Sequence, residues 1–229
     1  MQRFFTLFKY AVIGLASILL VSLLVGLISA AFDDKPRRVV RQSAPVYAET
    51  PSVRQYSRED ELIDVYTHAY DASARLSRGD FRQIAKFELL QADWNSALAP
   101  LVRGLRDPNM VPDEWAQSAR RYLNDVEMIK VKMGVAAAQV EDSSARSFLQ
   151  QISGINNQIF IAWEDIRQAV ANGDNDAYRR AGMRAQGLAQ EKANVAGPVL
   201  RRLREKLGDK AVDGALEREL RELARKVGM

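Results

Sequence analysis

The chain has 229 residues, no cysteine and one histidine. The lack of cysteine excludes disulfides, thiolate nucleophiles and cysteine-based zinc or iron–sulfur sites, and a single histidine excludes metal motifs that need two. Seven of the 33 basic and three of the 29 acidic residues precede Ser57, which leaves 26 of each sign in the rest of the chain. Because nucleic-acid-binding domains carry a clear basic excess, this neutral region argues against that function.

The first predicted element is a transmembrane helix over residues 11–32, after a short N-terminal tail of residues 1–10. These 22 residues, from Ala11 to Phe32, contain no charge and no proline. As a helix they would measure about 33 Å, enough to cross a hydrocarbon core of about 30 Å. The alternative is a cleavable signal peptide with its cut at Ser29-Ala30-Ala31. The apolar run is longer than the roughly 7 to 15 residues of that class, which favours an uncleaved, single-pass anchor.

Residues 33–56 are predicted to form a tether, because Pro36, Pro45 and Pro51 interrupt any helical period. The end of the tether nearest the membrane is basic, with Lys35, Arg37, Arg38 and Arg41. These four side chains are candidate contacts with anionic lipid headgroups. The alternative is a stop-transfer flank without a specific partner.

The sequence gives only a weak indication of how the predicted anchor is oriented in the membrane. Arg3 and Lys9 precede it and four basic residues follow it, so the positive-inside rule favours neither side strongly. A short basic tail is typical of a cytoplasmic start, and large domains translocate largely regardless of charge. We therefore expect an inner (cytoplasmic) membrane protein whose C-terminal domain is extracytoplasmic.

Residues 57–197 predict an all-α, antiparallel bundle of about five helices. Apolar residues recur at spacings of three and four, most regularly at Phe148, Ile152, Ile155, Ile159, Trp163, Ile166 and Val170. Short connections between long amphipathic helices favour a bundle. The three tryptophans lie on such stripes and are predicted core residues; an aromatic ligand pocket is the alternative.

Helix ends are predicted from caps and breakers. Ser57 with Asp60 resembles a capping box, Pro112 suits a first helical position, and residues 172–174 should close one helix and cap the next. The first helix is expected to continue to Ser77, with Gly79 ending it and Asp80 capping its successor.

Two prolines are expected to disturb their helices. Pro100 should kink or split the second helix of the bundle, and Gly197-Pro198 should kink or end the fifth.

Residues 198–229 are predicted to form a charged C-terminal helical segment. Its apolar positions form a narrow seam, which we call the C-terminal seam: Leu216, Leu220, Leu223 and Val227. A narrow seam flanked by Glu and Arg is typical of helices that bind one partner helix, as in a coiled coil. The C-terminal seam is therefore the predicted partner-binding site. Docking on the chain's own bundle and self-association are the alternatives.

One cluster of metal-ligating residue types lies on a single face of the first predicted helix: Asp60, Asp64, His68 and Asp71. Such side chains can hold a cation if a second helix adds a carboxylate. A solvated acidic face explains them equally well, so the sequence predicts neither a metal site nor a cofactor.

No Gly-rich phosphate loop and no Ser/His/acid arrangement is present, and enzymatic activity is not expected. The sequence predicts a membrane-anchored scaffold or adaptor of a bacterial-type cell envelope, which holds a protein partner near the membrane. A sensory or small-molecule-binding helical domain is the alternative.

Overall fold

The computed structural model describes residues 57–211 and 214–228, and every regular element in this part of the chain is a helix. The helices in chain order are α2 (Arg58–Ala69), α3 (Arg78–Arg106), α4 (Pro112–Ala138), α5 (Ser143–Asn172), α6 (Asn175–Leu207), the 3-10 helix η2 (Gly208–Ala211) and α7 (Ala215–Val227). The prediction of an all-α bundle is confirmed for these residues. The predicted anchor, the predicted tether and its candidate lipid contacts, Lys35, Arg37, Arg38 and Arg41, lie outside them.

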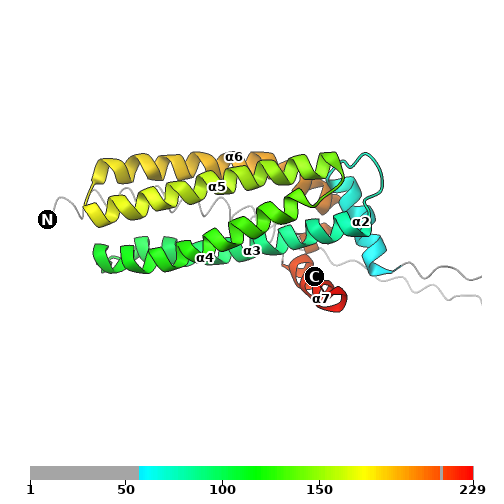
Figure 1. The fold of residues 1–229 in the computed structure, drawn as a ribbon, viewed down its shortest axis with the longest axis horizontal. Helices are drawn as coiled ribbons and strands as arrows, with labels where there is room; N and C mark the ends of the chain where they lie inside the picture. The colour runs from blue at the N-terminus through cyan, green and yellow to red at the C-terminus, as the bar shows by residue number, and fades with distance from the viewer. Residues whose placement is uncertain (1–56, 212–213, 229) are drawn as a thin grey trace, which may run out of the picture.

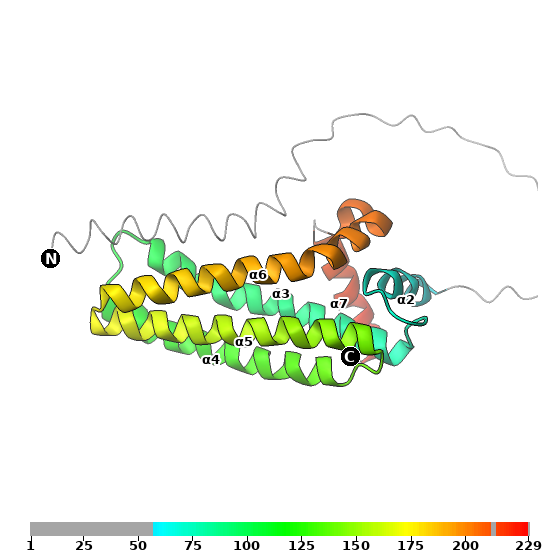
Figure 2. The same cartoon turned by 90° about the horizontal axis from the view of Figure 1, so that it is seen from above.

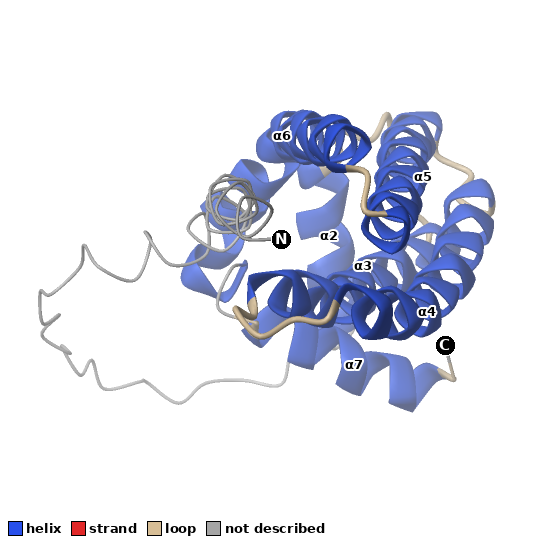
Figure 3. Ribbon diagram, turned by 90° about the vertical axis from the view of Figure 1, so that its left-hand side faces the viewer, coloured by secondary structure: helices blue, strands red, loops and turns tan. Residues whose placement is uncertain are grey.

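Four long helices, α3 to α6, lie side by side and form an elongated bundle (Figure 1). Helices consecutive in the chain pack closely and run in opposite directions, α3 with α4, α4 with α5 and α5 with α6 (Figure 2). The shorter helices lie at one end of the bundle, where α2 packs mainly on α6 and α7 on α3. Figure 3 shows the same arrangement along the bundle.

Several predicted helix ends are confirmed. Ser57 and Asp60 form a capping box at the start of α2, and α4 begins at Pro112. Gly173 ends α5 in the left-handed region at φ 66°, a conformation that glycine adopts without steric cost, and the Asp174 side chain caps α6.

The predicted boundary between the first two helices is wrong. Helix α2 ends at Ala69, and Asp71 adopts a left-handed φ of 53°. Leu76 still reaches the core, but from the connecting loop, where its backbone N–H donates to the Thr67 hydroxyl at 3.0 Å. The N-cap of α3 is Ser77, so Asp80 lies inside the first turn and Gly79 ends no helix.

Neither proline ends its helix. Helix α3 runs through Pro100 and α6 runs through Pro198, so a split at either position is excluded. A proline removes one backbone hydrogen bond, and buried side chains just beyond each one, Leu101 and Val199, hold the helix in place. Figure 2 shows the orange end of α6 turning away from the axis of its yellow part.

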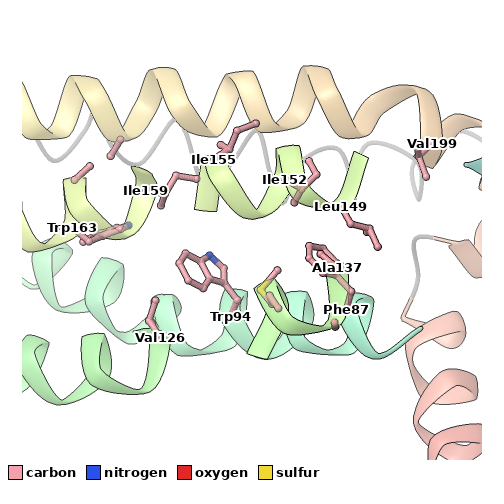
Figure 4. Close-up of a cluster of buried hydrophobic side chains, with 14 of the residues drawn as sticks. Phe87, Trp94, Val126, Ala137, Leu149, Ile152, Ile155, Ile159, Trp163 and Val199 are labelled. Carbon is pink, nitrogen blue, oxygen red and sulfur yellow. The ribbon is translucent and has the colours of Figure 1, made fainter. Parts of the chain in front are cut away.

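The core fills the space between the four long helices. Trp94 and Trp163 point into it from α3 and α5 and are 1% and 5% exposed (Figure 4). Trp115 is also buried, and its indole N–H donates to the Leu101 carbonyl at 3.2 Å. This ring lies so close to α3 that a Cβ added at Gly104 would approach it to 2.6 Å. The prediction that all three tryptophans are core residues is confirmed.

Candidate interaction surfaces and a buried polar cluster

The C-terminal seam faces the chain's own bundle. Leu216 and Leu220 are buried, Leu223 is half-buried against the core, and Val227 is partly exposed. The described residues therefore place α7 on α3, which was the alternative to partner binding. Capture of a partner by these four residues stays a prediction.

Two sets of ion pairs orient α7. The Arg58 guanidinium donates to both Glu219 oxygens, one of them at 3.0 Å, and Arg221 donates to Asp93 at 2.8 Å. These hydrogen bonds raise the pKa of Arg58 and Arg221 and lower the pKa of Glu219. Because exposed ion pairs contribute about 0 to 1 kcal/mol each, the apolar contacts supply most of the docking energy.

Replacing Leu220 by alanine is expected to destabilise the docked α7 by about 2 to 4 kcal/mol, because the side chain is 2% exposed. Limited proteolysis should then cleave the segment after Gly208 faster than in the unmodified chain. Replacing the exposed Arg225 by alanine is the matched control on the same helix and should leave the cleavage rate unchanged. Equal rates for all three chains would show that α7 is not held by its seam.

Acidic side chains of α2 form ion pairs with basic side chains that follow the helix in the chain. The Asp60 carboxylate accepts hydrogen bonds from the Ser57 hydroxyl at 2.7 Å and from Arg78 at 3.2 Å, and these bonds lower its pKa to about 2. Asp64 pairs with Arg75. The described residues contain no group of three or more His, Asp or Glu side chains that could hold a metal ion.

His68 is exposed and lies 3.9 Å from a Glu205 oxygen. It borders an open hollow of about 380 Å³ lined by Asp64, Thr67, His68, Asp71, Ala72 and Arg75.

Replacing His68 by alanine is expected to change the free energy of unfolding by less than about 1 kcal/mol, because the residue is exposed and its one ion pair is long. Urea denaturation and metal analysis of the purified full chain would check this. Loss of a bound metal in the variant would contradict the solvated-face interpretation.

One exposed helix face is apolar. Met128, Val131 and Val135 of α4 are 57%, 58% and 49% exposed, and their spacing of three and four places them in a single line. We call these three residues the α4 row. Val126 and Met133 are fully buried on the opposite side of α4, so the row points away from the core. Apolar side chains that line up on a surface, rather than scatter singly, are typical of interaction sites.

Ionisable side chains also cluster where α2, α3 and α6 meet, and two of them, Glu88 and Lys192, are half-buried. The hydroxyl of Tyr70 donates to Glu88 at 2.6 Å, and burial raises the pKa of Glu88. Burial lowers the pKa of Lys192 on α6 to about 7, although the nearby Glu88 charge acts in the opposite direction. Tyr66 is fully buried, and its hydroxyl has no hydrogen-bond partner among the described residues. Glu88, Lys192, Tyr66 and Tyr70 form what we call the polar cluster.

A second polar contact joins α3 to α5, between Gln91 and Asn156. The Asn156 amide of α5 is 1% exposed and donates to the Gln91 side chain at 2.9 Å. Pairing the buried Asn156 amide with the half-buried Gln91 side chain lowers the cost of burying a polar group.

The sequence analysis assigned no role to the α4 row or to the polar cluster. A signal was present for both ionisable residues, since Glu88 follows Ile84 by four positions and Lys192 follows Leu188 by four. That spacing places each charge on the inward face of its helix. The α4 row repeats at spacings of three and four on the face opposite the buried residues Val126 and Met133.

The chain matches no protein-family model, no curated protein and no solved structure. Across residues 57–211 and 214–228, no helix is both long and apolar enough to cross a bilayer.

Proposed function

We propose that this protein is a membrane-anchored, non-enzymatic scaffold or adaptor of a bacterial-type cell envelope, which holds a protein partner near the membrane. The α4 row carries the proposal. Three large apolar side chains, each about half-exposed or more, lie on one line of a long rigid helix. Burying them against a partner would remove apolar surface from water, at about 25 cal/mol per Å².

The apolar run at residues 11–32 and the proline-containing tether at residues 33–56 support the membrane part of the proposal. If residues 33–56 form the predicted tether, these 24 residues could extend several tens of ångströms and let the bundle orient its α4 row toward a partner.

The test is site-specific photo-crosslinking of the full chain in native membranes. A photoreactive residue at Val135, next to Val131 in the α4 row, should give a discrete protein adduct. The same residue at Gln186, an exposed position on α6, is the matched control and should give none. If the chain resists alkaline extraction from the membranes but gives no adduct from Val135, the scaffold proposal is contradicted.

The polar cluster favours a second candidate, a sensory or small-molecule-binding domain. A half-buried lysine and a tyrosine hydroxyl without a hydrogen-bond partner among the described residues are groups that a small carboxylate can satisfy. A melting temperature that rises with small carboxylates, and no longer rises after Lys192→Met, would favour this candidate over the scaffold.

A further inference from the structure

We propose that the α4 row binds the α4 row of a second copy of this chain, with the two helices parallel and in register. This inference rests on the proposed function, because it names the partner that the α4 row would hold. The argument depends on the apolar spacing of the row and on the charges that flank it.

The exposed face of α4 has the spacing of a coiled-coil seam. The α4 row is flanked by two smaller exposed residues at the same spacing. Together they form a five-residue seam: Asn124, Met128, Val131, Val135 and Ala138. Successive steps of four, three, four and three residues are those of alternating a and d positions. The buried residues Val126 and Met133 occupy the positions opposite this seam, so α4 can bind its bundle and a second helix at once.

The charges beside the seam are self-complementary in a parallel pair. With Met128 and Val135 at a positions, Arg120 and Glu127 occupy g positions, and Asp125 and Lys132 occupy e positions. In a parallel pair each g residue faces the e residue five positions later on the other copy. Arg120 therefore faces Asp125 of the second copy and Glu127 faces its Lys132, and the two-fold symmetry repeats both contacts. All four residues are exposed. No flanking pair brings like charges together.

An antiparallel pair uses the same charges less well. Centred between Met128 and Val131, it sets Asp125 against Lys132 but places Glu127 opposite Gly134. Arg121 is the one charge that a parallel pair brings near its own copy. It lies at the N-terminal end of the seam and is exposed, so its long side chain can turn toward water.

The chain contains no cysteine, which permits a direct test of the register. Val131→Cys in the purified full chain should give a disulfide-linked dimer on mild oxidation, because a parallel pair brings identical positions together. Gln186→Cys, at an exposed position of α6, is the control and should give no disulfide-linked dimer. Mixing Met128→Cys with Val131→Cys distinguishes the orientations. A mixed disulfide that forms in preference to the Val131→Cys dimer would overturn the parallel arrangement.

The charges are tested by reversal and restoration in the same full chain. Glu127→Lys should weaken the dimer about tenfold, because it places a lysine of each copy opposite Lys132 of the other copy and so creates two like-charge contacts. The swap Glu127→Lys/Lys132→Glu should restore the affinity, whereas Glu191→Lys, at an exposed position of α6, should leave it unchanged. Sedimentation equilibrium measures the dissociation constant, and circular dichroism checks that each variant is folded.

A chain that stays monomeric in both tests would overturn the inference. If Val135 then still crosslinks to a different protein in native membranes, the scaffold proposal stands and only the identity of the partner is wrong. If Val135 crosslinks to nothing, both proposals fail.

Discussion

Replacing Trp163 by alanine is expected to lower the free energy of unfolding by about 3 to 5 kcal/mol. The side chain lies in the C-terminal half of α5, is 5% exposed and points into the core. Helix α5 packs closely on both α4 and α6, so the cavity would open between three helices that cannot easily collapse around it. Urea denaturation of the full chain, followed by circular dichroism, measures the change.

Ile161 provides a matched control two residues away on the same helix. Its side chain is 36% exposed, so Ile161→Ala should cost less than about 1 kcal/mol. If both substitutions destabilise the protein equally, the loss reflects helix propensity along α5 and not the packing of the tryptophan.

The helices of the bundle could be predicted because their signals are local. In α5, Ile152, Ile159 and Ile166 repeat at one face of a helix, and all three are buried where the period places them. Caps such as Asp174 act on backbone groups only three residues away, so they too could be read from neighbouring residues.

The boundary between α2 and α3 could not be predicted in the same way, because distant residues decide it. The Asp80 carboxylate accepts the backbone N–H of Glu141, which is 61 residues later in the chain. That contact engages Asp80 inside the first turn of α3, while Ser77 provides the cap. Spacing within one segment contains no information about such a contact.

The candidate sites show the same limit. The period of Leu216 and Leu220 marks an apolar face, but only the fold shows that α3 covers it. The position of Glu88 on an inward face was readable from the sequence, whereas its hydrogen bond to Tyr70 depends on how the loop after α2 returns to α3.

Between about pH 7 and pH 9.5 the free energy of unfolding is expected to rise with pH, and Lys192→Met should remove most of this rise. Burial lowers the pKa of Lys192 from 10.5 to about 7 in the folded protein. In this range the unfolded chain therefore binds more protons than the folded one, and stability increases as protons are withdrawn. The slope from one such group is at most about 1.4 kcal/mol per pH unit, and we expect about half of that or more.

The neighbouring ionisable groups change the free energy of unfolding in the opposite direction to Lys192 as pH rises. The measurement therefore needs variants that separate their contributions. The pKa of Glu88 is raised from 4.5 by burial, so its contribution to stability is present in acid and is lost as pH rises through its folded pKa. Tyr66 and Tyr70 have pKa values raised well above 10.0, so their contribution is lost only above the window. Urea denaturation at pH 7, 8 and 9 should give a rising free energy for the full chain and for Glu88→Gln, but a flat one for Lys192→Met. A rise that persists after Lys192→Met would show that this amine is charged and solvated in the folded protein.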